Sequence, residues 1–210
     1  MSAGCSALWP LGYDARAVTE QHPQAVSPAP DSDAALVASA RAGDARAFDT
    51  LVLRYRNDVY GLCYRYTRHR EDAWDAAQDV FIKAHQALGR FRGDSSFKTW
   101  VLRIAANHCK DRFKRRRLAT VAMEDSHQQA AAPARTTPDR AATARELGAA
   151  IDAAVDALSP KHRLAFILRE YEGLRYEEMA EVMGCSLGTV MSRLHHARRK
   201  LQDSLIRMGY

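Results

Sequence analysis

The stretch LREYEGLRYEEMAEVMGCSLGTVMSRLHHARRKL, Leu168–Leu201, joins two short amphipathic segments to a long segment dense in Arg, Lys and His. Residues 176–183 predict a short helix with its methionines turned inward. Gly184 then supplies a left-handed turn residue, and Ser186 can cap the helix that follows. This arrangement is typical of a helix-turn-helix.

The last segment has two different faces. Its apolar face consists of Val190, Leu194, Ala197, Leu201 and Leu205. Its opposite face carries hydrogen-bonding and basic groups, namely Thr189, Ser192, Arg193, His196, Arg199 and Lys200. Such a helix suits the major groove of DNA, where its N-terminal residues reach base edges. A solvated basic face on a C-terminal helix is the alternative interpretation.

Outside this stretch, apolar residues recur at steps of three and four, and no run alternates as a strand would. The expected fold is therefore all-α, with two small helical domains. We expect a mostly disordered leader over residues 1–30, a first domain over 31–118, a flexible linker over 119–140 and the helix-turn-helix domain over 141–210. The linker is predicted from its Ala, Gln, Thr and Pro content.

The formal net charge of +6 over 210 residues favours a polyanionic partner such as nucleic acid. The four cysteines, Cys5, Cys63, Cys109 and Cys185, show neither zinc-site nor disulfide-framework spacing. A reduced, cytoplasmic chain is the simplest inference. We expect no membrane insertion, because no segment approaches the roughly 20 apolar residues that a span needs.

In the first domain, a buried stripe runs from Phe48 to Tyr66. The next helix, residues 72–88, is expected to bury Trp74, Ala77, Phe81, Ala84 and Leu88 in part. It also carries an acidic and amide-bearing strip, formed by Asp72, Asp75, Gln78 and Asp79. This strip favours a protein partner, and a solvated face is the alternative.

The segment FRGDSSFKTWVLRIAANHCKDRFKRRR, residues 91–117, opens with a loop that can cap a helix beginning near Phe97. From residue 98 to residue 117 it holds eight Lys/Arg and one Asp. Exposed aromatic rings beside such a basic track would stack on the bases of single-stranded nucleic acid. For Phe97 a place in the core is as good an interpretation as an exposed stacking role. For Trp100 a place in the core is the better of the two.

Four blocks in the right order resemble the bacterial sigma factors of the extracytoplasmic-function group. They are SDAALVASARAGDARAFDTLVLRY, AAQDVFIKAHQAL, FRGDSSFKTWVLRIAANHCKDRFKRR and the stretch quoted first. The resemblance implies a chain that binds core RNA polymerase, directs it to particular promoter DNA and helps to melt it. An anti-sigma factor is a further expected partner, and no cofactor, metal or enzymatic activity is expected.

The resemblance also implies roles for individual residues. The polymerase would be bound by Asp72, Asp75, Gln78, Asp79 and Phe81. The −10 element would be bound by Phe91, Arg92, Asp94, Ser95, Ser96, Phe97, Lys98, Arg103, Asn107 and Lys110. The −35 element would be bound by Arg175, Ser186, Thr189, Ser192, Arg193, His195, His196, Arg198, Arg199 and Lys200.

Two positions depart from the family pattern. Met191 stands where an Arg is frequent, and His195 and His196 stand where a basic or aromatic pair is frequent. An unusual −35 preference is therefore expected. A stand-alone helix-turn-helix regulator and a nucleic-acid enzyme are the competing hypotheses, but the sequence shows no dimerisation segment and no catalytic cluster.

Overall fold

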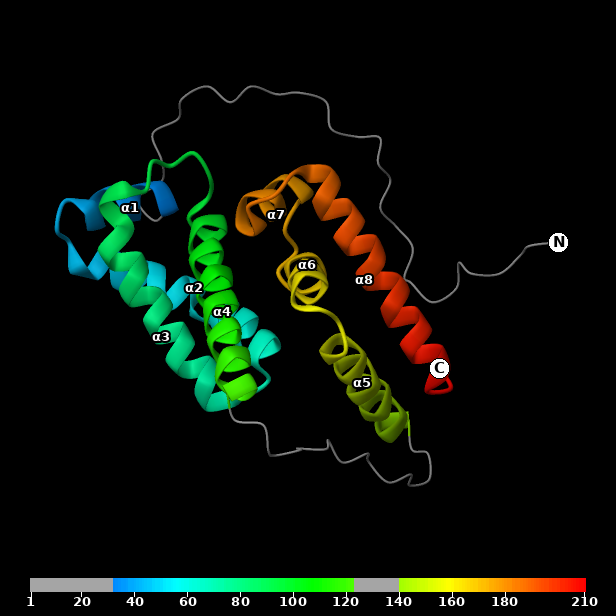
Figure 1. The fold of residues 1–210 in the computed structure, drawn as a ribbon. Coiled ribbons are helices and arrows are strands. Elements are labelled where there is room, and N and C mark those ends of the chain that lie inside the picture. Colours follow the sequence, from blue (N-terminus) through cyan, green and yellow to red (C-terminus); the bar gives the residue numbers. More distant parts are fainter. Residues whose placement is uncertain (1–31, 123–139) are drawn as a thin grey trace.

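A computed structural model describes residues 32–122 and 140–210 of the chain (Figure 1). In these two ranges all regular structure is helical, which confirms the all-α prediction. The first range contains α1 (Asp33–Arg41), α2 (Ala45–Thr67), α3 (Arg70–Ala87), the short 3₁₀ helix η1 (Leu88–Arg90) and α4 (Phe97–Ala122). The second contains α5 (Arg140–Asp156), α6 (Pro160–Glu170), α7 (Tyr176–Met183) and α8 (Leu187–Arg207).

The predicted leader and most of the predicted linker lie outside the described residues. The residues at which the two domains begin and end stay a prediction.

The first domain is built around α2, which packs against α1, α3 and α4. The predicted stripe of α2 is confirmed as its buried side, with Phe48, Leu51, Val59, Leu62, Cys63 and Tyr66 in the core. Asp44 begins this helix by accepting the backbone N–H of Arg46 at 3.0 Å. At the other end Arg68 adopts a left-handed conformation (φ 58°), which turns the chain toward α3.

The expectation that α3 buries Trp74 is wrong, because this side chain is 60% exposed. The buried face of α3 is instead made of small residues: Ala73, Ala76, Ala77, Val80 and Ala84. Such small side chains let α3 lie close to α2 and α4, so no room is left for an indole. Trp74 lies outside this contact. Its ring packs edge-to-face with that of Tyr60, and the two ring centroids are 6.1 Å apart.

The second domain contains the predicted helix-turn-helix. Gly184 ends α7 in the left-handed region (φ 62°), and the Ser186 hydroxyl accepts the backbone N–H of Thr189 at 3.3 Å to begin α8. The predicted apolar face of α8 is buried at Val190, Leu194, Ala197 and Leu201. Leu147 of α5 is 38% exposed.

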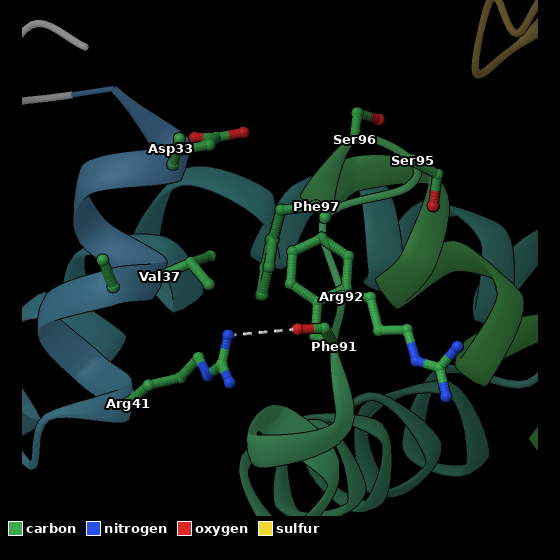
Figure 2. A pocket seen from close by; sticks show the side chains of 11 residues that line it. Asp33, Val37, Arg41, Phe91, Arg92, Ser95, Ser96 and Phe97 are labelled. Atoms are coloured by element: carbon green, nitrogen blue, oxygen red, sulfur yellow. Dashed lines mark hydrogen bonds between the residues drawn. The ribbon is translucent and has the colours of Figure 1, made fainter. Parts of the chain in front are cut away.

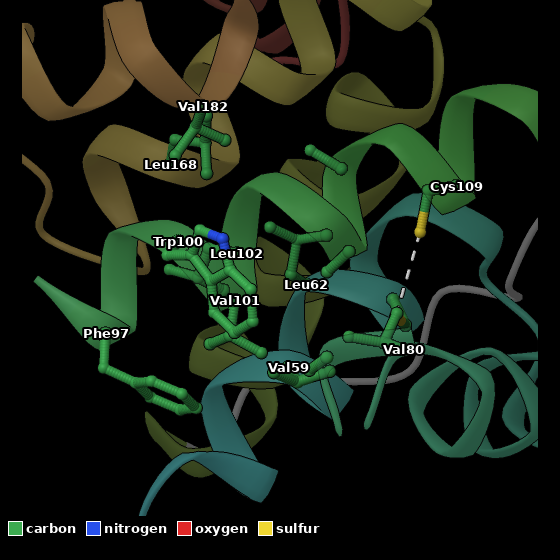
Figure 3. Packing of buried hydrophobic residues seen from close by; sticks show 14 of the residues in the cluster. Val59, Leu62, Val80, Phe97, Trp100, Val101, Leu102, Cys109, Leu168 and Val182 are labelled. Atoms are coloured by element: carbon green, nitrogen blue, oxygen red, sulfur yellow. Dashed lines mark hydrogen bonds between the residues drawn. The ribbon is translucent and has the colours of Figure 1, made fainter. Parts of the chain in front are cut away.

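The two domains pack against each other. Helix α4 contacts α7, and α2 contacts α6. One buried cluster extends across this boundary and includes Leu102 of α4, Leu168 of α6 and Val182 of α7 (Figure 3). A second, smaller cluster is formed by α5, the turn after it, α6 and α8. The larger core therefore belongs to both domains.

Candidate promoter and polymerase interfaces

The loop before α4 is shaped by one capping residue. Ser96 begins the helix by accepting the backbone N–H of Thr99 at 3.0 Å, and its hydroxyl also lies 2.8 Å from that of Thr99. The predicted cap at this position is confirmed. Where the loop begins, Arg41 of α1 donates hydrogen bonds to the carbonyl oxygens of Phe91 at 3.4 Å and Gly89 at 3.5 Å.

A pocket of about 340 Å³ lies between α1 and this loop (Figure 2). The loop contributes Phe91, Arg92, Gly93, Ser95, Ser96 and Phe97, and α1 contributes Asp33, Ala34, Val37, Ala38 and Arg41. The volume lies near the lower end of the range of about 300–1,000 Å³ that is typical of small-ligand sites. The pocket combines an apolar interior with cationic and hydroxyl groups.

The aromatic residues of this segment belong to the core. Phe91, Phe97 and Trp100 are 7%, 2% and 7% exposed, and their rings pack together with centroids 5.0–6.1 Å apart. The interpretation of Phe97 and Trp100 as core residues is thus supported, and the interpretation as exposed stacking platforms is not. Phe91 and Phe97 still reach the wall of the pocket.

The basic residues of α4 have different environments. Arg103 and Asn107 are exposed, and the Asn107 side-chain oxygen accepts a hydrogen bond from Lys110 at 3.2 Å. Lys98 forms an ion pair with Asp58 of α2 at 2.8 Å. Burial, followed by the nearby Arg193 of α8, lowers the pKa of Lys110.

The strip on α3 is divided between free and paired residues. Asp75 and Gln78 are exposed, whereas Asp72 forms an ion pair with Arg112 of α4. Asp79 is largely exposed and lies 3.6 Å from the His108 ring of α4. The other predicted polymerase-binding residue, Phe81, is only half-buried and packs on the core.

Sequence reasoning missed one residue of this strip. Ile82 is 55% exposed, although it is a large aliphatic residue. It follows Gln78 by four positions and Asp79 by three, so helical spacing places it on the same face. That spacing could have identified it.

The predicted −35 residues differ in what they contact. Ser192, His195, His196, Arg199 and Lys200 are exposed. Ser186 and Thr189 share the cap of α8, with their hydroxyl groups 2.9 Å apart. The Arg193 guanidinium donates to the Cys185 sulfur at 3.4 Å.

Two of the arginines predicted to bind the −35 element, Arg175 and Arg198, have acidic partners in the chain. Arg198 forms an ion pair with Glu170 of α6 at 2.7 Å. Arg175 donates its backbone N–H to Glu178 at 2.8 Å and lies 3.5 Å from the same carboxylate through its side chain. Both would have to share or release these contacts to bind DNA.

The described residues contain no cluster of three or more His, Cys, Asp or Glu suited to a metal ion. In the same part of the chain, no helix has both the length and the apolar character to cross a membrane.

Comparison with known proteins identifies the family. A family model described as Sigma-70 region 2 matches residues 51–119, and one described as Sigma-70, region 4 matches residues 148–201. The chain is 41% identical to the RNA polymerase sigma-H factor of Pseudomonas aeruginosa, across 83% of this chain and 94% of the relative. It is 36% identical to the ECF RNA polymerase sigma-E factor of Haemophilus influenzae, across 83% of this chain and 95% of the relative.

The fold is also similar to that of a solved sigma factor. RpoE of Bartonella quintana, crystallised with the anti-sigma factor NepR, superposes with a TM-score of 0.62 at 25% identity. The similarity covers 76% of this chain and 97% of that chain. The family expected from the four sequence blocks is confirmed, and the chain belongs to the extracytoplasmic-function group of the sigma-70 family of sigma factors.

Proposed function

We propose that this alternative sigma factor, which directs RNA polymerase to promoters, opens the duplex by capturing an unpaired base of the −10 element in the pocket between α1 and the loop 91–96. The pocket is the observation that carries the proposal. A base that leaves the stack needs a site with apolar walls and polar groups that read its edge. The pocket offers both, through Phe97 and Val37 on one hand and Arg92 and Ser95 on the other.

The neighbouring surfaces fit the same role. Arg103, Asn107 and Lys110 extend the basic surface along α4 beside the loop, where they would follow the displaced strand. The exposed N-terminal half of α8, with Ser192 and Arg193, would enter the major groove at the −35 element. The opened strand and the −35 duplex would thus be bound by different domains.

The remaining assignments concern partners. The strip on α3 would bind core polymerase through Asp75, Gln78, Asp79 and Ile82, whose side chains are exposed on one face. Because RpoE of Bartonella quintana was solved with an anti-sigma factor, we infer such a partner here as well. The protein would act in the cytoplasm, without cofactor or enzymatic activity, and RNA synthesis would belong to the polymerase.

Permanganate footprinting tests the pocket, because this reagent modifies unpaired thymines. With core polymerase and a responsive promoter, Arg92→Ala should lower opening about tenfold, as expected for a lost charge-assisted hydrogen bond. Arg90→Ala removes the same charge two residues away, outside the pocket lining, and should leave opening nearly unchanged.

Affinity for the closed promoter, measured by gel shift, should be similar for both variants. Equal opening by the two variants would contradict the proposed base pocket.

A further inference from the structure

The contact between the two domains includes a buried carboxylic acid. Glu172 lies in the loop between α6 and α7, and its side chain is only 4% exposed. From α2, Arg65 approaches this carboxyl group to 3.9 Å, and Asp58 faces it as well. From α4, Lys98 donates to the Glu172 backbone oxygen at 3.3 Å. The loop of one domain is thus seated between two helices of the other.

The surrounding contacts orient the same loop. Within it, the Tyr171 ring lies under the Arg65 guanidinium, 4.1 Å from the ring centroid. At the edge of the interface, Arg68, which follows α2, pairs with Asp152 at 3.2 Å and Asp156 at 3.0 Å on α5. The two domains are therefore joined by directed polar contacts as well as by apolar packing.

A glycine makes room for this approach. Gly61 lies inside α2, where glycine is less favourable than alanine by about 1 kcal/mol. A Cβ at this position would lie 2.6 Å from Arg65 Nη1 and 3.8 Å from Glu172 Oε1. A Cβ alone would displace only the tip of the Arg65 side chain and would be in ordinary contact with Glu172, whereas a longer side chain would extend into the space that the Arg65 guanidinium and the Glu172 carboxyl group occupy.

The closed arrangement cannot span a promoter. Elements named −10 and −35 are about 25 base pairs apart, which is about 85 Å of duplex at about 3.4 Å per pair. The proposed DNA residues extend over about 18 Å of α4, from Lys98 to Lys110, and about 21 Å of α8, from Ser186 to Lys200, at about 1.5 Å per residue. Because α4 also contacts α7, the two faces lie too close together to bind both elements at once.

We propose that Glu172 latches the helix-turn-helix domain onto α2 and α4, that this contact holds the free sigma factor closed, and that loss of the carboxyl proton weakens it. The occupant of this surface on the first domain is the chain's own second domain. The docking stands on the interface alone, whereas its consequence for promoters rests on the proposed function.

The direction of the proton effect follows from the surroundings of Glu172. Burial first, and Asp58 next, raise its pKa to about 7, while Lys98 and Arg65 oppose the rise. The closed form therefore holds the proton more tightly than an open form with the ordinary value of 4.5. Closure is favoured in full below that value and is lost as the pH rises through about 7. Between about pH 6 and pH 8, the ratio of closed to open chains should fall about tenfold.

Small-angle X-ray scattering of the full chain at constant ionic strength measures the two states. The parent should be compact at pH 6 and larger at pH 8. Glu172→Gln cannot lose the proton and should stay compact at both values. Gly61→Gln should be expanded at both, although α2 gains a better helix former. Circular dichroism confirms that each variant is folded.

A parent of constant size, or a Glu172→Gln variant that expands with pH as the parent does, would overturn the latch. Scattering involves neither polymerase nor DNA, so this outcome is independent of the base pocket. As a separate measurement, the isolated Gly61→Gln chain should bind a promoter fragment that carries both the −35 duplex and an unpaired −10 strand more tightly than the parent at pH 6, because only the open chain can reach both elements. Equal binding would overturn the promoter consequence alone.

Discussion

Ile82 is expected to be the apolar centre of the strip on α3 that we propose binds polymerase. Full burial of an isoleucine side chain is worth about 1.5–3 kcal/mol. Since Ile82 is 55% exposed in the free chain, covering its remaining surface would contribute about 0.8–1.6 kcal/mol. Loss of that contribution would weaken polymerase binding about 4- to 15-fold. Replacement by aspartate should exceed this range, because it also buries an unpaired charge.

The assay compares Ile82→Asp with Leu53→Asp. Leu53 lies on α2 in the same domain and is 62% exposed, so the two variants introduce the same charge at equally open helical sites. Competition with the parent for core polymerase gives the relative affinities. Thermal unfolding should change by less than about 0.5 kcal/mol in both, as is usual for surface substitutions.

Ile82→Asp should lose affinity and Leu53→Asp should keep it. If Ile82→Asp bound as well as the parent, the strip would be a solvated face. A loss of affinity in Leu53→Asp alone would indicate that α2, and not α3, contacts the polymerase.

Three further predictions address the rest of the chain. Gly184→Ala forces an alanine to φ 62° and should lower the melting temperature by about 4–8 °C, whereas Gly188→Ala in the first turn of α8 should not. Burial first, and then a nearby lysine, lower the pKa of His108 below 6.5, so stability should fall as the pH drops through 6.5 and below, and His108→Gln should reduce that fall in acid melts. His195 and His196 are exposed on α8; if a phosphate favours their charged form, binding of a −35 duplex by the holoenzyme should strengthen from pH 8 to pH 6 more in the parent than in His195→Gln or His196→Gln, and this difference between parent and variants is the measured quantity.

The spacing of residues along the sequence was sufficient to predict the helices and the turn between α7 and α8. The α2 stripe and the Gly184 and Ser186 positions involve residues within a few turns of one another, where periodicity and capping rules apply directly. The same rules failed for Trp74. Its size suggested burial, but α3 approaches its neighbours along alanines, and only the packing partners determine which side of a helix is buried.

The candidate site was only half predictable for a related reason. The loop 91–97 and the basic surface of α4 are continuous in the sequence, so their composition alone predicted a nucleic-acid-binding segment. The opposite wall of the pocket comes from α1, including Asp33 and Arg41, about fifty residues earlier. No spacing rule relates these segments, because their contact arises only when both pack on α2. The seating of Glu172 against the first domain was hidden for the same reason.

The closed arrangement is opposed by the surfaces that the function requires. Arg193 lowers the pKa of Lys110 across the domain boundary, which shows that cationic residues of the two proposed DNA faces approach one another. Each face needs its positive charge for phosphate binding, so bringing the faces together carries a repulsion that apolar packing and Glu172 must offset. In the proposed open state, a polyanion would neutralise this charge and polymerase would hold the domains apart. Added salt screens the repulsion in the closed chain and weakens the phosphate contacts in the open one. Both effects favour closure. The affinity of the chain for promoter DNA should therefore fall more steeply with salt than the loss of phosphate contacts alone predicts.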